Sequence, residues 1–173
     1  MEGLLQHQVK LVPHQAAWDE EFLHCRSMLL EVWGDNVLDI QHVGSTAVPS
    51  ICAKPILDVA VRLKSMAAMD VAALTAKGYS YEGPHFGSEE YQVFVLRKDG
   101  NISLHHIHCY GAAEPGFDEL VGFRDYLNEH LHAAKEYERI KFNLAEKHAS
   151  ERHAYTKGKG EFIRSIYAKL KEK

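Results

Sequence analysis

The chain has 173 residues, of which 46% are hydrophobic and 25% charged, and this balance is typical of a single ordinary globular domain spanning residues 1–173. Its formal net charge is −4, which gives no support for the basic surface that sequence-independent nucleic-acid binding requires, and we expect no nucleic-acid partner. Lys and Arg crowd the C-terminal third, where a local basic patch could form. The three cysteines are odd in number and show no Cys-x-x-Cys spacing, which argues against a disulfide framework or a thiolate zinc site.

Targeting and membrane signals are not evident in the sequence. The N-terminal segment has no apolar stretch behind positive charge, and no apolar run approaches the length that crosses a membrane. We therefore expect an unexported cytoplasmic protein with no membrane partner, and the reduced state expected of its cysteines fits that compartment.

The first half of the chain alternates between strand-like and helical patterns. Residues 9–12 form a short apolar run before a proline, and residues 14–32 carry apolar side chains at intervals of three and four, the period of an amphipathic helix. Apolar runs rich in Val, Ile and Leu predict strands at 37–43 and 55–61. A serine at position 65 is expected to cap a second helix that continues to Lys77.

The second half is expected to begin with a loop and to end in helices. Gly-Pro and Gly-Ser pairs predict a loop over 79–90, and an Asp-Gly turn predicts a hairpin of strands 91–97 and 102–109. Helical patterns follow at 117–131, 133–148 and 151–170. The whole pattern favours an α+β (α/β) fold, a mixed β-sheet flanked by helices with a helical C-terminal region.

The segment between the strands at 37–43 and 55–61 is rich in small and hydroxylated residues. Gly44, Ser45 and Thr46 can bring successive N–H groups and hydroxyls close to a phosphate, and Lys54 adds positive charge. Asp58 lies inside an apolar strand, where an unpaired carboxylate is unfavourable, so it is expected to face a cleft, a cation or a metal. Alternatively, it forms a structural ion pair with Lys54 or an arginine.

Three histidines of the predicted strand 102–109 form a second group. His106 and His108 point to one face of a strand and His105 to the other, so two imidazoles could converge where Asp58 points. Two histidines and one carboxylate are a usable set for a divalent metal with open positions. Alternatively, these histidines form hydrogen bonds within the sheet or donate to a phosphate.

Other candidates for ligand binding lie outside these two groups. His42 is at the end of its strand, where it could be a base, a phosphate donor or a surface residue. Arg124 could clamp a phosphate or carboxylate, or pair with Asp125 on a helix surface. Lys157 belongs to a basic stretch that binds phosphate or is simply a solvated face.

The chain resembles the GrpB family from about Val9 to its C-terminus. The resemblance rests on separated motifs in a fixed order: HVGSTAVP, AKPILDV, the His-x-His strand, FRDYL, EYERIK and AYTKGKGEFI. It implies a fold similar to the nucleotidyltransferase superfamily, in which a Gly-Ser turn holds nucleotide phosphates and carboxylates on the next strand hold Mg²⁺.

Residues carried over from this resemblance match only in part. Gly44 and Ser45 match the Gly-Ser turn, and Asp58 matches the first carboxylate of an Asp-x-Asp pair. Ala60 stands where the second carboxylate is expected, and Gln41 replaces a glutamate that is usual before the His-Val-Gly-Ser run. His106 or His108 stands near the place of a third acidic ligand.

Three functions remain in competition. The first is transfer of a nucleotidyl group from a nucleotide, with Asp58, His106 and His108 as catalytic or metal-binding residues and Mg²⁺, Mn²⁺ or Zn²⁺ as cofactor. The second is a non-catalytic module of the same fold that binds a nucleotide or another phosphorylated small molecule. The third is a metallo-hydrolase with one metal on the same three residues.

Overall fold

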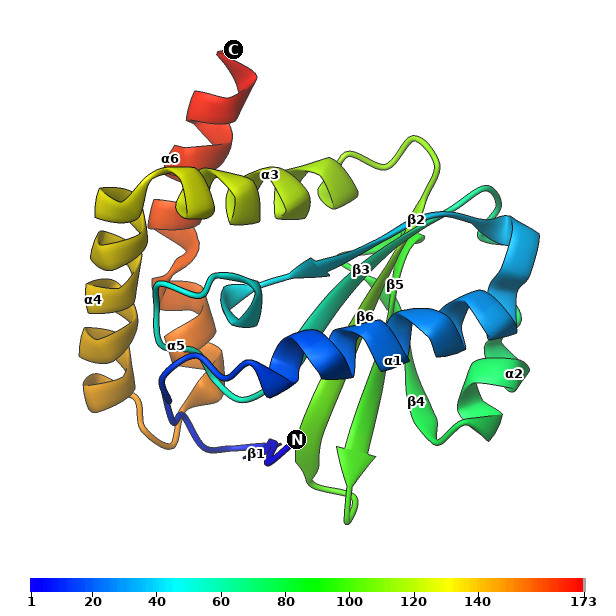
Figure 1. Cartoon of the computed structure of the whole chain (residues 1–173), viewed down its shortest axis with the longest axis horizontal. Coiled ribbons are helices and arrows are strands. Elements are labelled where there is room, and N and C mark those ends of the chain that lie inside the picture. The colour runs from blue at the N-terminus through cyan, green and yellow to red at the C-terminus, as the bar shows by residue number, and fades with distance from the viewer. Residues whose placement is uncertain (173) are drawn as a thin grey trace.

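A six-stranded mixed sheet forms the centre of the molecule (Figure 1). The computed structural model describes residues 1–172, apart from the side chain of residue 152. Strands follow the order β2-β3-β6-β5-β4, with β1 paired to β6, and only β3 and β6 run parallel. The strands are β1 (Leu4–Leu5), β2 (Val37–Val43), β3 (Leu57–Leu63), β4 (Tyr79–His85), β5 (Ser88–Lys98) and β6 (Ile102–Gly111).

Helices cover the sheet and extend beyond one end of it. In Figure 1, α1 runs across one face, while α4, α5 and α6 stand together beside the sheet. The helices are α1 (Ala17–Trp33), α2 (Val71–Ala76), α3 (Gly116–Glu129), α4 (Leu131–Lys147), α5 (Arg152–Gly158) and α6 (Gly160–Lys171), with short 3-10 helices η1 (Gly34–Asn36) and η2 (Ser45–Ala47). The expected α+β class with a helical C-terminal region is confirmed.

Alternation along β3 decides which residues enter the main core. Val59 and Val61 are fully buried and pack with Leu29 and Trp33 of α1. Asp58 and Ala60 point to the opposite face, where Ala60 packs with a cluster that includes Phe117 of α3. The period of two therefore separates an apolar layer from the face that carries Asp58.

Strand assignment from the sequence was wrong at the N-terminus. Residues 9–12 do not join the sheet: Val9 donates its N–H to Ala149 O, and Val12 forms an isolated bridge with Ala53. Because its backbone partners lie in two different loops, this run links loop segments instead of forming a strand. The short strand that does pair with β6 is β1.

The prediction of a loop over 79–90 is also wrong. This segment forms β4 and the start of β5, joined at Phe86 and Gly87. Gly83 and Pro84 lie on β4, where the register shifts, and β4 is at the edge of the sheet. An edge strand tolerates glycine and proline because its outer backbone groups need no partner strand. The predicted Asp-Gly hairpin between β5 and β6 is confirmed.

Two helical predictions also differ from the structure. The helix expected from Ser65 to Lys77 is shorter in the structure, where only α2 is helical. Asp70 caps the start of α2, since its side chain accepts a 2.9 Å hydrogen bond from Ala73 N. The helix expected over 151–170 is divided into α5 and α6. The division follows Gly158, where a β carbon would lie 2.4 Å from Leu144 Cδ2 of α4.

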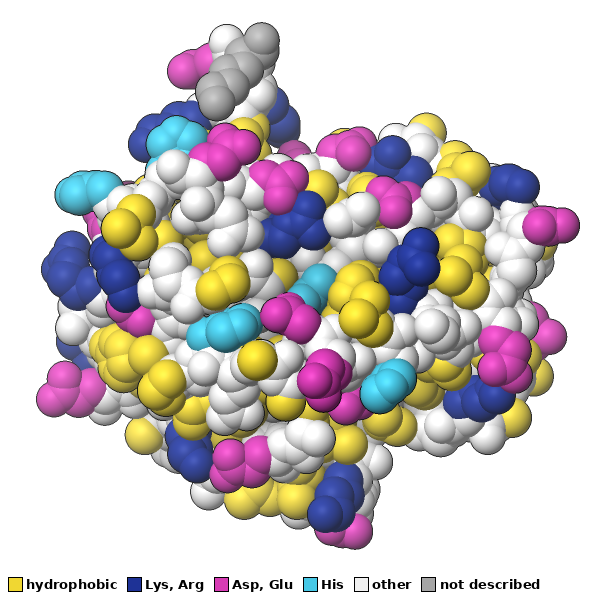
Figure 2. Space-filling view, in the orientation of Figure 1, with side chains coloured by type: hydrophobic (Ala, Val, Ile, Leu, Met, Phe, Trp, Pro, Cys, Tyr) yellow, Lys and Arg dark blue, Asp and Glu magenta, His cyan; other side chains and the backbone are white. Residues whose placement is uncertain are grey.

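Charged side chains are mixed on the face shown in Figure 2, where Lys and Arg alternate with Asp and Glu instead of gathering into one basic patch. This face therefore offers no continuous positive surface for a nucleic-acid backbone. Among residues 1–172, no helix combines the length and the apolar character needed to cross a membrane.

Candidate functional site

The parallel pairing of β3 with β6 brings a carboxylate and two imidazoles together. Asp58 pairs with His106 and Ala60 pairs with His108, so all of these side chains share one face. Asp58 Oδ1 lies 3.2 Å from His106 Nδ1 and 3.4 Å from His108 Nε2. The three residues that the sequence suggested as a set therefore meet around one oxygen atom.

His108 is held in place by a residue that the sequence gave no reason to select. Tyr91 Oη lies 2.9 Å from His108 Nδ1, and the Tyr91 ring stacks on Tyr110 with centroids 4.6 Å apart. Burial raises the pKa of Tyr91 to about 12, so its hydroxyl keeps its proton at neutral pH. Tyr91 O–H donates to His108 Nδ1 when His108 Nε2–H donates to Asp58, and the hydroxyl would accept from Nδ1–H if the Nε2 lone pair bound a metal.

The Asp58 carboxyl is ionised in this setting. Burial by itself would raise the pKa of Asp58, but hydrogen bonds from His106 and His108 outweigh it, and the pKa lies well below its usual range. An ionised carboxylate beside two imidazoles can attract a cation.

These groups fit a divalent metal. Asp58, His106 and His108 each offer one ligand atom, and these atoms lie within 4.8 Å of one another. Neighbouring ligands of a metal are about 3.0 to 3.4 Å apart, because each lies about 2.1 Å from the ion. The distances of 3.2 and 3.4 Å from Asp58 Oδ1 match this spacing. Two nitrogens and one oxygen suit Mn²⁺ or Zn²⁺ better than Mg²⁺.

The Gly-Ser turn lies directly beside this carboxylate. Gly44 has φ of +71°, and the following residues, Ser45–Ala47, form η2. A hydrogen bond of 2.9 Å between its Oγ1 and His42 Nε2 holds the Thr46 side chain in place. The turn therefore presents its small residues to the space in front of Asp58.

A chamber of about 240 Å³, here called the turn chamber, opens between this turn and the C-terminal helices. The Tyr155 ring in its wall is buried and has two cations near it, Lys54 Nζ at 5.1 Å and Lys159 Nζ at 4.9 Å from the centroid. Its lining includes Gly44, Ser45, Thr46, Asp58, His106 and Tyr137. Hydroxyl groups, two ammonium groups and a carboxylate–imidazole cluster that line one space are suited to an anion and a metal.

The loop that carries Lys54 is tied to α4. Lys135 Nζ donates to Ser50 O at 2.6 Å, and the buried Lys141 Nζ donates to Cys52 O. Burial, together with the charge of Lys159, lowers the pKa of Lys141 to about 7. Because two of its lysines bind the loop backbone, α4 holds the part of the turn chamber wall that carries Lys54.

His42 and His105 lie on the other face of the sheet. His42 stacks on Phe22 with centroids 5.2 Å apart, and burial lowers the pKa of His42 to about 4. His105 forms hydrogen bonds to Tyr79 Oη at 2.7 Å and to Glu21 Oε1 at 2.9 Å. Both imidazoles therefore pack under α1, and His42 reaches the turn only through Thr46.

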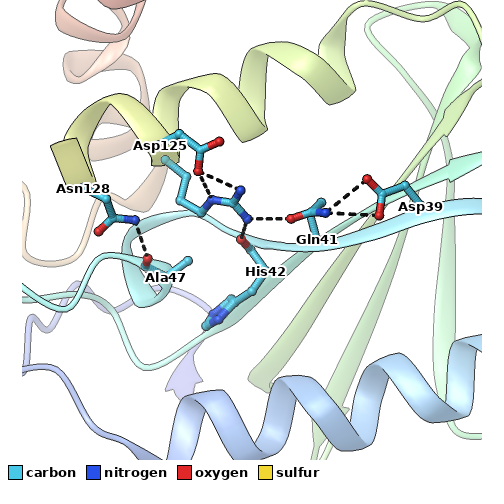
Figure 3. A network of polar contacts seen from close by, with 7 residues as sticks. Asp39, Gln41, His42, Ala47, Asp125 and Asn128 are labelled. Carbon is cyan, nitrogen blue, oxygen red and sulfur yellow. Dashed lines mark hydrogen bonds and ion pairs between the residues drawn. The ribbon is translucent and has the colours of Figure 1, made fainter.

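Arg124 connects α3 to β2. Figure 3 labels its partners Gln41, His42 and Asp125. Arg124 Nη1 donates to His42 O at 2.8 Å and to Gln41 Oε1 at 2.9 Å, and the other side of the guanidinium group pairs with Asp125. Gln41 Nε2 in turn donates to both carboxylate oxygens of Asp39 at 3.1 Å. An amide at position 41 can accept from arginine and donate to aspartate together, which a glutamate cannot do.

Lys157 is exposed and is not among the described residues that line the turn chamber. The lysine of that stretch that does line it is Lys159. The sequence singled out this basic stretch, but it did not select Lys159 over Lys157. Tyr91 and Tyr137 carried no signal, because an aromatic residue in a strand or helix pattern is usual in any core.

Comparison with known proteins shows to which family the chain belongs. The sequence model of the family described as GrpB protein matches residues 8–169. The chain belongs to the GrpB family. Glutamate-rich protein GrpB of Alkalihalophilus pseudofirmus is 36% identical over 171 residues, covering 96% of this chain and 98% of that one. The UPF0157 protein YqkA of Bacillus subtilis is 33% identical over 163 residues, which are 92% of this chain and 46% of YqkA, so the chain spans about half of that relative.

Solved structures agree on the fold of this GrpB protein. GrpB from Enterococcus faecalis superimposes with a TM-score of 0.78 at 27% identity, covering 91% of this chain and 99% of that one. The Cid1 poly(U) polymerase, in a structure with MgGTP bound, matches with a TM-score of 0.52 at 11% identity, covering 79% of this chain and 44% of that one. The fold is therefore nucleotidyltransferase-like, and a likeness at this identity supports the fold alone.

Proposed function

We propose that this GrpB protein binds a nucleotide or a related phosphorylated small molecule in the turn chamber and transfers its nucleotidyl group with the help of one divalent metal. The observation that carries the proposal is the meeting of Asp58, His106 and His108 beside the Gly44 turn. In this proposal, the three side chains hold Mn²⁺ or Zn²⁺, which would polarise the reacting phosphate and offset its charge.

The rest of the turn chamber would hold the phosphates. Ser45 and Thr46 provide hydroxyl groups, and Lys54 and Lys159, which also line the chamber, provide positive charge. Tyr137 lines the same space, but its ring is buried against Phe162 and Lys141, so it shapes the wall and does not stack on a base. In the transfer, an acceptor oxygen bonds to the α-phosphorus, the bond to pyrophosphate breaks, and the acceptor's proton passes to solvent.

A binding module without catalysis is the second candidate, and a specific observation favours it. Ala60 pairs with His108 and packs under α3, so its position offers no second carboxylate, and the Gln41 amide is engaged by Arg124. Two-metal chemistry needs carboxylates that bridge both cations. One carboxylate supports at most a single-metal site, which would also suit a metallo-hydrolase.

One set of titrations separates these three functions. Tag-free protein is treated with EDTA and studied by calorimetry with Mn²⁺, Zn²⁺ or Mg²⁺, each with and without a non-hydrolysable nucleoside triphosphate. We expect one Mn²⁺ or Zn²⁺ per chain and triphosphate binding that becomes stronger with metal. Asp58→Asn should abolish the metal response, whereas Asp35→Asn, an exposed aspartate of η1, should leave it unchanged.

Each alternative has its own result. Triphosphate binding that is equally strong in EDTA would identify a module that needs no metal. Metal binding without any triphosphate affinity would favour the hydrolase. If neither metal nor triphosphate binds, the proposal is wrong.

A further inference from the structure

Another cavity adjoins the turn chamber. A second chamber of about 340 Å³, here called the outer chamber, shares His106 and Thr156 with it as common wall residues. The outer chamber lies where β1, β5, β6 and α5 meet, and its lining includes His7, Arg97, Ser103 and His153. The imidazole beside Asp58 therefore contacts two adjoining spaces.

The ionisable side chains that line the outer chamber are all basic. Arg97 and the histidines at positions 7 and 153 are its ionisable residues besides His106, and none of the described residues that line it carries a carboxylate. Arg97 Nη1 is paired with Glu82 Oε1 at 2.7 Å, which leaves the rest of the guanidinium group to face other partners. A chamber with this lining is suited to an acidic group.

One hydrogen-bond donor of Arg97 has no acceptor among the described residues. This donor, Nε, is buried, although the side chain as a whole is 20% exposed. A buried N–H without a partner is unfavourable, so the Arg97 side chain would gain from a rearrangement that brings Nε to a ligand oxygen in the chamber. Carboxylate and phosphate oxygens are the acceptors that a guanidinium group binds most strongly.

We propose that the outer chamber binds the carboxylate or phosphate group of a second small molecule through Arg97, His7 and His153. Its volume is within the range of small-metabolite sites. Since His106 lines both chambers, the remainder of this molecule would reach the Asp58 site past His106. Its role as the acceptor of the transferred group rests on the proposed function, whereas its binding does not.

Histidine NMR can test the binding directly. The ring signals of His7 and His153 are assigned from single substitutions and followed while metal-free protein is titrated with inorganic phosphate or, separately, with succinate. We expect saturable shifts of both signals with at least one of the two probes, and the stronger probe identifies the acidic group. Arg97→Gln should weaken that binding about tenfold, the loss expected for a charged hydrogen bond.

Three further variants make the result decisive. Arg26→Gln removes the same charge from the exposed surface of α1 and should leave the affinity unchanged. Lys159→Gln alters only the turn chamber, so it should weaken nucleotide binding and preserve the shifts of His7 and His153. If Arg97→Gln fails to fold, His153→Gln at an exposed position of α5 should also weaken the probe, by a smaller factor.

The proposal is overturned if neither probe moves the two signals, or if the His7 signal reports an unchanged affinity for the probe in both Arg97→Gln and His153→Gln. Failure of nucleotide or metal binding would contradict the proposed function only, because this titration uses neither.

Discussion

Gly44 and Asp58 approach each other so closely that a β carbon at position 44 would lie 2.5 Å from Asp58 Oδ2. Atoms at that distance overlap, so any side chain at position 44 must displace the carboxylate or the turn. Gly44 also has φ of +71°, a backbone conformation that favours glycine. The turn and the carboxylate are therefore built as one unit.

Replacing Gly44 by alanine tests this unit. Gly44→Ala should lower the free energy of unfolding by about 1–3 kcal/mol through backbone strain, with a further loss of about 1 kcal/mol or more from the displaced carboxylate. Gly87→Ala is the matched control, because Gly87 has φ of +74° and open space where a β carbon would lie. Denaturant unfolding of both variants isolates the Asp58 contact. Equal losses of unfolding free energy in Gly44→Ala and Gly87→Ala would show that backbone strain alone causes the loss and that the Asp58 contact adds nothing.

Tyr91 orients His108, and removing its hydroxyl should weaken the metal site. Tyr91→Phe leaves the stacked ring in place but removes the partner of His108 Nδ1 at 2.9 Å. Loss of such a supporting hydrogen bond reduces metal affinity by about 10- to 100-fold. Calorimetry with Mn²⁺ or Zn²⁺ measures the change. Tyr81→Phe is the control, since its hydroxyl bonds to Gln92. Equal affinity in wild type and Tyr91→Phe would contradict the orienting role.

Much of the site geometry could be predicted from the sequence. Period-two alternation places Asp58 on one face of β3, and places His106 and His108 together on one face of β6. Alternation is a local property, so it survives in the folded chain. The pairing of β3 with β6 is not local, and the sequence alone could not fix the register that aligns Asp58 with His106.

The remaining walls of the site depend on contacts between distant segments. Lys159 and Tyr155 reach the turn chamber because α5 packs next to α4, more than 90 residues after the turn in sequence. Arg124 was a candidate ligand residue for its chemistry, yet its bonds to Gln41 and His42 use that same chemistry to join α3 to β2. A guanidinium fork serves either purpose, and only the positions of its neighbours distinguish them.

Arg124 should therefore act on stability and not on ligand affinity. Arg124→Gln removes the hydrogen bonds to His42 O and Gln41 Oε1 and the ion pair with Asp125. Hydrogen bonds from charged groups contribute about 1.5–3 kcal/mol, so the free energy of unfolding should fall by that amount. Nucleotide affinity should change less than about threefold, since the side chain lies outside the turn chamber. Arg139→Gln, exposed on α4, is the control for the loss of charge. A large loss of affinity at unchanged stability would contradict this assignment.

Lys141 should make stability depend on pH above neutrality. Its side chain is 1% exposed, and burial with the nearby Lys159 charge lowers its pKa from 10.5 to about 7. Between these two values the folded state holds a neutral amine while the unfolded state binds a proton. The unfolded state thus binds more protons, and the free energy of unfolding rises with pH by up to about 1.4 kcal/mol per pH unit. Below pH 7 both states are protonated, and this contribution becomes flat.

Lys141→Met isolates that contribution. The difference in unfolding free energy between wild type and Lys141→Met should shift in favour of wild type as pH rises from about 7 to 8.5, because methionine cannot titrate. Groups shared by both proteins cancel in this difference, including the buried Cys25, whose pKa burial raises to about 12. Lys147→Met, at an exposed position of the same helix, should show no such slope. Urea unfolding at four pH values measures all three proteins. A difference independent of pH would mean that Lys141 stays charged inside the fold, with Cys52 O and the Tyr137 ring stabilising the ammonium group.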